Sequence, residues 1–296
     1  GDARQGRRYV AGDTAMSEWR RVEYNLDAFH PDERGFHYGD GLFETIAIRD
    51  GKPRLWSYHA ERLQSSCEKL GLERPDDIRL EVHLEAALKD SNENTNCCTA
   101  KIIVTAGIGK RGYARPSRGR SQSYIGIFPA NPPNKPAYQK GVATVLCETR
   151  LGVGSPLAGM KTLNRLEQVL ARSEVTPTGA FEGLTLDAEG RVICGTMSNV
   201  FIVRDKRVLT PSLERCGVSG IMRRLVIEEL NRSNEPVVVT DLSMDDLANA
   251  DEVFITNSQM GAVPVHRCGE LHWSVGPATR DVMGLLAERG VEECRL

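Results

Sequence analysis

The feature that most limits how this chain can fold is a proline-rich segment near its middle, PANPPNKP at residues 129–136. Proline lacks a backbone N–H and fixes its own φ angle, so this segment interrupts helices and strands alike. We therefore expect an interdomain linker at residues 130–139, between a smaller N-terminal domain at 16–129 and a larger C-terminal domain at 140–296. Residues 1–15 are polar and lack the apolar core of a secretory signal, so we expect a disordered extension there.

Short apolar runs and helical periodicities alternate on both sides of this segment. Strands are predicted at 19–25, 42–48, 100–105, 124–128, 142–147, 200–203, 207–210, 237–240 and 253–256, with a hairpin over 184–192. Helices are predicted at 58–70, 77–90, from 161 onward, 220–230 and 244–249. Mixed strands, helices and hairpins without an internal repeat predict two domains of the α/β (α+β) class.

Composition excludes several classes of function. The formal net charge is −2, so no general basic field favours nucleic acid, and no apolar run is long enough to span a membrane. The eight cysteines form no CxxC pair and no Cys/His cluster with metal-ligand spacing. We expect reduced thiols, a cytoplasmic location and no metal.

A formal match to GxGxxG, GIGKRG at residues 107–112, follows the strand predicted at 100–105. A dinucleotide site needs a helix to begin there and an acidic residue about twenty positions later. Pro116 and scattered arginines follow instead. We expect a basic substrate loop at this position, although a solvated loop explains each cation equally well.

Lys161 stands before a run in which Leu163, Leu166 and Leu170 recur at helical spacing. We expect a helix that begins at the lysine and turns these leucines toward a core. A second helix predicted from Gly220 would offer unpaired N–H groups to a phosphate, with Arg62 as a further cation. A solvated lysine and a ligand-free helix start remain the alternatives, and pyridoxal phosphate is one cofactor that would suit the set.

Six segments, RGFHYGDGLFETI, HAERL, GMKTLNRLEQVLAR, GTMSNVFIV, LTPSLERCGVSGIMRR and DEVFITNS, occur in this order. They resemble the fold-type IV, or class IV aminotransferase-like, pyridoxal-phosphate enzymes over about residues 18–286. The resemblance implies the two-domain fold of the D-amino-acid aminotransferases, a cofactor-binding C-terminal domain and a homodimer.

Within this group the chain looks most like the 4-amino-4-deoxychorismate lyases. These enzymes convert aminodeoxychorismate to 4-aminobenzoate and pyruvate in folate synthesis. An aminotransferase of the D-amino-acid or branched-chain type is the alternative, and a relative with altered or lost cofactor use is another.

The resemblance also implies roles for individual residues. Lys161 would be the catalytic lysine that binds the cofactor covalently and moves protons, and Arg62 would hold the cofactor phosphate. Arg111 and Tyr38 are candidate substrate contacts. The remaining cofactor contacts would be Cys194, Asn199, the backbone at Gly220, Ile221 and Met222, and the pair Thr256 and Asn257.

Cys194 is where the chain departs from the family pattern. Members of the family usually carry a glutamate at this place, which pairs with the pyridine nitrogen of the cofactor. A buried thiol is a weak donor and stays neutral. Three explanations are open: a lyase that tolerates weak ring activation, a neighbouring residue that replaces the glutamate, or a relative with altered chemistry or no cofactor.

Overall fold

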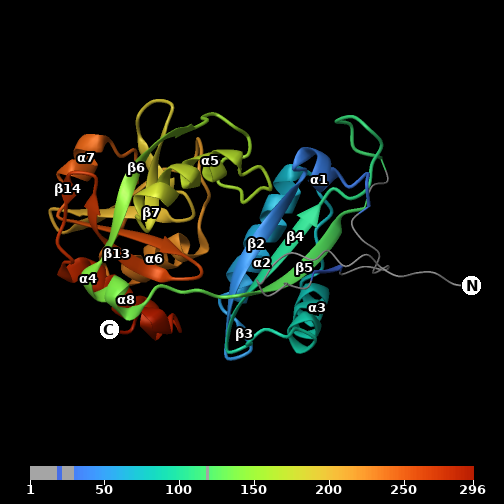
Figure 1. Cartoon of the computed structure of the whole chain (residues 1–296), viewed down its shortest axis with the longest axis horizontal. Coiled ribbons are helices and arrows are strands. Elements are labelled where there is room, and N and C mark those ends of the chain that lie inside the picture. The colour runs from blue at the N-terminus through green and yellow to red at the C-terminus, as the bar shows by residue number, and fades with distance from the viewer. Residues whose placement is uncertain (1–18, 22–29, 118–119) are drawn as a thin grey trace, which may run out of the picture.

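The computed structural model describes residues 19–21, 30–117 and 120–296. The extension predicted at 1–15 lies outside the described residues. The described elements form two groups, which lie side by side in Figure 1 and are joined by the segment that precedes β6. Each group is built around its own sheet.

The first sheet has five antiparallel strands in the order β1-β5-β4-β2-β3. Its strands are β1 (Trp19–Arg21), β2 (Gly41–Arg49), β3 (Lys52–Pro53), β4 (Cys97–Thr105) and β5 (Gln122–Pro129), and its helices are α1 (Arg34–Tyr38), α2 (Trp56–Leu70) and α3 (Asp77–Lys89). Alternate residues of β4, namely Cys98, Ala100, Ile102 and Val104, are buried, because successive side chains of a strand point to opposite faces.

The second sheet has nine strands, and the pairing of β8 with β9 closes part of it into a barrel. Its strands are β6 (Val142–Leu151), β7 (Glu182–Asp187), β8 (Val192–Gly195), β9 (Asn199–Arg204), β10 (Arg207–Pro211), β11 (Val238–Thr240), β12 (Glu252–Asn257), β13 (Gly261–Cys268) and β14 (Leu271–His272). The helices are α4 (Lys135–Lys140), α5 (Leu166–Val175), α6 (Ile221–Arg232), α7 (Met244–Ala248) and α8 (Pro277–Glu288), with 3₁₀ turns η1 (Thr176–Thr178) and η2 (Glu292–Cys294).

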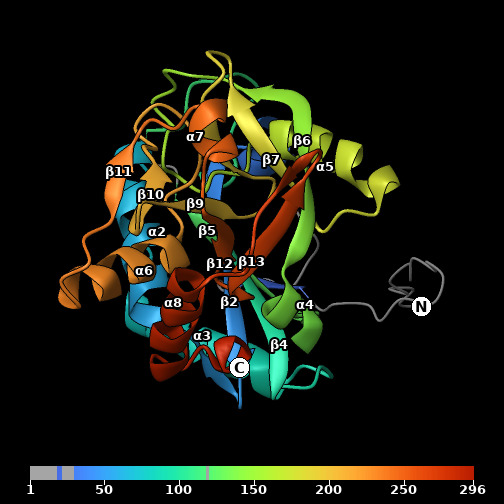
Figure 2. The ribbon, with the colours of Figure 1, turned by 90° about the vertical axis from the view of Figure 1, so that its left-hand side faces the viewer.

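Helices α6 and α8 pack together against the β12–β13 region (Figure 2). Beneath them, the rings of Phe201 and Phe254 stack with centroids 4.8 Å apart at the centre of the second core. No helix in the described part of the chain is long and apolar enough to cross a membrane.

Helix α4 lies within the segment predicted to lack regular structure. The Asn134 side chain accepts a hydrogen bond from the N–H of Ala137 at 3.2 Å and so caps the helix. Pro136 falls in the first turn, where its missing N–H is not needed. A capped first turn therefore accommodates a proline that the sequence pattern treats as a break.

The predicted helix after Lys161 begins five residues later, at Leu166, and it faces the other way. Leu166 is 77% exposed and Leu170 is 59% exposed, so the prediction that these leucines face a core was wrong. The buried face of α5 instead carries Ala171 and Val175, which pack against Cys147 of β6. Small side chains allow the helix to lie close to the sheet, and they leave the leucines outside.

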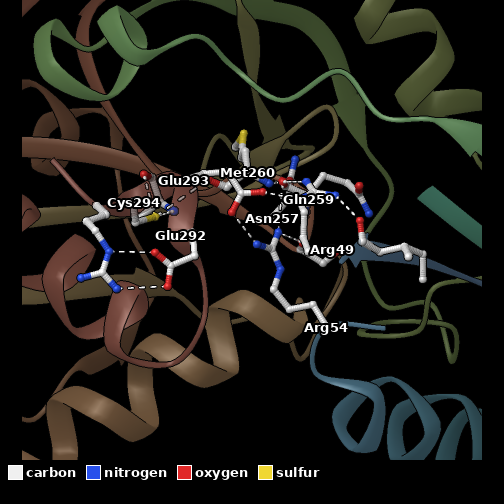
Figure 3. A network of polar contacts seen from close by, with 12 residues as sticks. Arg49, Arg54, Asn257, Gln259, Met260, Glu292, Glu293 and Cys294 are labelled. Atoms are coloured by element: carbon white, nitrogen blue, oxygen red, sulfur yellow. Dashed lines mark hydrogen bonds and ion pairs between the residues drawn. The ribbon is translucent and has the colours of Figure 1, made fainter. Parts of the chain in front are cut away.

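The C-terminal turn η2 joins the two groups of elements (Figure 3). The carboxylate of Glu293 accepts hydrogen bonds from Arg49 Nε at 2.7 Å and from Arg54 Nη1 at 2.6 Å. The same two guanidinium groups donate to the carbonyls of Ser258 and Gln259, in the turn after β12. A charged network thus fixes that turn against the first sheet.

Candidate functional site

A cavity of about 360 Å³ lies where the two groups of elements meet. Its walls come from β2, α2, the segment before α5, the β8–β9 turn, the start of α6 and the end of β12. Eight of the residues predicted for the site line it: Arg62, Lys161, Cys194, Asn199, Gly220, Ile221, Thr256 and Asn257. Segments far apart in the sequence are therefore brought to one place.

Three predicted site residues have side chains that do not line this cavity. The side chain of Met222 is 0% exposed and packs in the second core, so only its backbone can face the cavity. Tyr38 lines a neighbouring cavity of about 540 Å³, which also includes Thr162, and its hydroxyl accepts the N–H of Gly112 at 2.8 Å. Arg111 belongs to the exposed loop after β4 and is not among the residues that line either cavity.

Lys161 is held by strand pairing and not by a helix. The N–H of Phe43 donates to the carbonyl of Lys161 at 3.0 Å, and the N–H of Leu163 donates to the carbonyl of Gly41 at 3.0 Å. The intervening Thr162 forms a bridge with Leu42 of β2. This bridge to β2 places the lysine amine over the Phe43 ring, with Nζ 4.2 Å from the ring centroid.

The surroundings of Lys161 favour its neutral form. Burial, followed by the charge of Arg62, lowers the pKa of this amine from its ordinary 10.5 to about 7, although the Glu44 carboxylate acts in the opposite direction. A neutral amine is a nucleophile, whereas an ammonium group is not. The cavity thus makes Lys161 reactive near neutral pH.

The lowered pKa gives a direct prediction for the protein without cofactor. Modification of Lys161 by acetic anhydride, followed by peptide mass spectrometry across pH, should show a midpoint near 7. Because the folded protein binds fewer protons than the unfolded chain between about 7 and 10.5, Lys161 should also make stability rise with pH over that interval. The exposed Lys69 in the same digest controls for the reagent. A Lys161 midpoint near 10.5 would contradict the burial argument.

A buried group of charges beside Lys161 was missed from the sequence. Glu44 accepts Arg62 Nε at 2.8 Å and Arg62 Nη2 at 2.5 Å, and it also contacts His59 Nδ1 at 2.6 Å. Burial alone would raise the pKa of Glu44, but Arg62 and His59 outweigh it and lower the pKa to about 2. The sequence feature that could have indicated this group is an acidic residue within the apolar run of β2, together with a His and an Arg three residues apart on α2.

One end of the cavity is shaped for an anion. Helix α6 begins after Gly220, at the wall of the cavity, and no side chain caps it. Its first backbone N–H groups are therefore free to donate to a ligand. A Cβ on Gly220 would come within 2.0 Å of Asn199 Oδ1, so the glycine keeps this cradle open. Thr256 Oγ1 is buried there and has no hydrogen-bond partner in the described part of the chain. Arg62 reaches the same end through Nη1, which donates to the carbonyl of Ser219 at 2.9 Å.

Cys194 lines the cavity and is 7% exposed. Burial raises the pKa of its thiol to about 12, so the group is neutral near pH 7. The nearest hydroxyl, Thr185 Oγ1, lies 3.5 Å from Sγ. Glu182, on the neighbouring strand, is fully buried and bonds to Thr196 and Ser198 in the β8–β9 turn, so it supports the turn and does not line the cavity.

Comparison with known proteins shows the family to which this chain belongs. The model of the family described as amino-transferase class IV matches residues 41–268. The chain belongs to the class IV aminotransferase family. The α/β fold predicted from the sequence resemblance is therefore confirmed.

Individual proteins and solved structures of the family resemble this chain over most of its length. An aminodeoxychorismate lyase of Vibrio harveyi is 37% identical over 86% of this chain and 94% of its own length. The solved structure of 4-amino-4-deoxychorismate lyase from Pseudomonas aeruginosa matches with a TM-score of 0.84 and 38% identity, over 92% of this chain and 98% of that one. A putative branched-chain-amino-acid aminotransferase of Methanocaldococcus jannaschii is 30% identical over 79% of this chain and 80% of its own length.

Proposed function

We propose that this class IV protein is a pyridoxal-phosphate-dependent lyase that converts 4-amino-4-deoxychorismate to 4-aminobenzoate and pyruvate. The observation that carries the proposal is the Lys161 amine, with its pKa near 7, in a cavity whose far end suits an anion. Similarity to lyases over nearly the whole chain supports this choice over the other activities of the family.

The residues present fit the proposed cofactor. The α6 start at Gly220, Thr256 Oγ1 and Arg62 would hold its phosphate, because each can offer a hydrogen-bond donor at the same end. Asn199 and Cys194 would lie along the ring. When bound, pyridoxal phosphate supplies an electron sink next to the substrate amine.

Lys161 would supply the proton transfers. Its amine must first be neutral, which the pKa near 7 provides, and it can then take a proton from the substrate ring and pass it to the leaving enolpyruvyl group, which becomes pyruvate. Loss of that proton, together with departure of the enolpyruvyl oxygen, leaves an aromatic ring, so much of the driving force comes from the substrate. The Phe43 ring beneath Nζ limits the directions in which the amine can point.

A product assay tests the proposal. The purified protein with pyridoxal phosphate should release 4-aminobenzoate and pyruvate in equal amounts from 4-amino-4-deoxychorismate with no keto acid present. Liquid chromatography with mass spectrometry measures both products. The similarity to an aminotransferase favours a transaminase as the second candidate. Activity that strictly requires a keto-acid acceptor would establish that alternative and end the lyase proposal.

We also propose a cytoplasmic homodimer with a division into domains at residues 130–139. The support for a second copy is the exposed apolar surface formed by Leu166, Val169 and Leu170 of α5 with Met197 of the β8–β9 turn. Such a surface marks an interface in many proteins.

Arg111 and Tyr38 stay candidate substrate contacts in this proposal.

A further inference from the structure

Arg165 lies between Lys161 and α5, at a position that neither the sequence nor the proposed cofactor site explains. It lines the same cavity as Lys161. One end of its guanidinium group is fixed, because Nη2 donates to Thr162 Oγ1 at 2.8 Å. Its Nε is buried and has no hydrogen-bond partner in the described part of the chain. A planar donor group is thus held in place with one N–H unused.

The charge of Arg165 is also unbalanced. Three cationic side chains line the cavity: Arg62, Lys161 and Arg165. Glu44 neutralises Arg62 through two hydrogen bonds, and the pKa of Lys161 near 7 makes its amine largely neutral above that pH. No ion pair joins Arg165 to a carboxylate among the residues that the structure describes. The guanidinium group therefore holds the cavity's uncompensated positive charge.

Cys194 and Glu167 act electrostatically on Arg165, but neither forms an ion pair with it in the described part of the chain. The Cys194 thiol stays neutral because burial raises its pKa to about 12. Glu167 is exposed, and its Oε1 accepts the N–H of Gly152 at 3.1 Å. Arg165 also precedes the first turn of α5, where the helix dipole disfavours a cation. Burial lowers the pKa of Arg165, but an arginine keeps its charge in proteins.

An uncompensated charge in a cavity is costly unless a ligand pairs with it. The anion cradle at the α6 start is formed by other residues, so a phosphate bound there leaves Arg165 to a second anionic group. We propose that Arg165 binds a carboxylate of the substrate through its Nε edge. This inference rests on the proposed function, since both products of that reaction, 4-aminobenzoate and pyruvate, carry a carboxylate. Arginine suits the task because its planar donors match the two oxygens of a carboxylate.

The test compares Arg165→Gln and Arg165→Lys with the wild-type protein loaded with cofactor. Calorimetry measures the binding of 4-aminobenzoate, of pyruvate and of aniline, which lacks a carboxylate. We expect Arg165→Gln to lower the affinity for either 4-aminobenzoate or pyruvate by about 10- to 100-fold, the range for loss of a charge-assisted hydrogen bond. The affinity for aniline should change less than about twofold. The affinity of Arg165→Lys for the carboxylate ligand should lie between those of the wild type and Arg165→Gln. The ligand whose affinity falls identifies the part of the substrate whose carboxylate Arg165 binds.

Arg207→Gln is the matched control, because it removes one positive charge from an exposed position on β10. A thermal melt of the cofactor-free proteins separates binding from folding. Removing an uncompensated charge should leave the melting temperature of Arg165→Gln equal to or above that of the wild type, whereas a structural arginine would lower it. The visible absorption of the bound cofactor should not change. In turnover, KM should rise more than kcat falls.

Affinities for 4-aminobenzoate and pyruvate that both stay within about twofold in Arg165→Gln would overturn the inference, whatever the wild type catalyses. A wild-type protein that binds an aromatic carboxylate through Arg165 but makes no 4-aminobenzoate would instead overturn the proposed lyase function. A lowered melting temperature with unchanged affinities would assign Arg165 a structural role. The two proposals therefore fail by different measurements.

Discussion

Lys161→Ala is expected to abolish turnover, with a loss of at least about a thousandfold, because in the proposed function the lysine is both the covalent attachment point and the group that moves protons. The visible absorption band that develops when the wild type is mixed with pyridoxal phosphate should be absent. The cradle at Gly220 and Thr256 does not involve the lysine amine. The variant should therefore still bind pyridoxal phosphate, but reversibly, so that dialysis removes it.

The chain offers a close control for this experiment. Lys101 of β4 also places its amine near the Phe43 ring, with Nζ 4.9 Å from the centroid, but it does not line the cavity. Lys101→Ala should keep the absorption band and most of the activity. If Lys161→Ala retained the band, or if both variants lost it equally, the lysine would not be the attachment point. A spectrum and a single-turnover assay distinguish these results.

The difference between the predicted and observed setting of Lys161 has a physical cause. Leucines at helical spacing do predict a helix, and α5 exists, but spacing alone does not say which side of a helix meets the sheet. The small residues Ala171 and Val175 decide that here, because they let α5 approach β6. The lysine then lies beside a β-bridge between Thr162 and Leu42, and its carbonyl accepts the N–H of Phe43, so the contact joins residues more than a hundred positions apart.

Most of the strands and helices on both sides of the proline-rich segment could be predicted, because each has a local pattern. The hairpin around Asp187–Gly190 and the glycine that ends α2 at Gly71 are examples. The contacts between Glu44, His59 and Arg62 could not be predicted in detail, since they depend on how α2 lies on β2. Arg165 was missed because its importance comes from an Nε without a hydrogen-bond partner in the described part of the chain, which no sequence pattern displays.

Gly220→Ala is expected to reduce the affinity for pyridoxal phosphate by at least about tenfold, which corresponds to roughly 1.4 kcal/mol. The backbone of Gly220 has φ −68° and ψ 142°, a conformation open to any residue, so the substitution introduces no backbone strain. The added methyl group, however, would lie 2.0 Å from Asn199 Oδ1. The Asn199 side chain must then move and give up the hydrogen bond from its Nδ2 to the carbonyl of Val218, which is 2.9 Å long.

Equilibrium dialysis of the cofactor against both proteins measures this effect, with Gly284→Ala as the control. Gly284 lies inside α8, where a Cβ would meet no atom within 4 Å, so alanine there should keep the affinity and stabilise the helix by up to about 1 kcal/mol. Overpacking at Gly220 should cost about 1–3 kcal/mol of stability even without cofactor. Lower stability with an unchanged cofactor affinity would mean that the start of α6 is a packing contact only. The phosphate would then have to bind at another wall of the cavity.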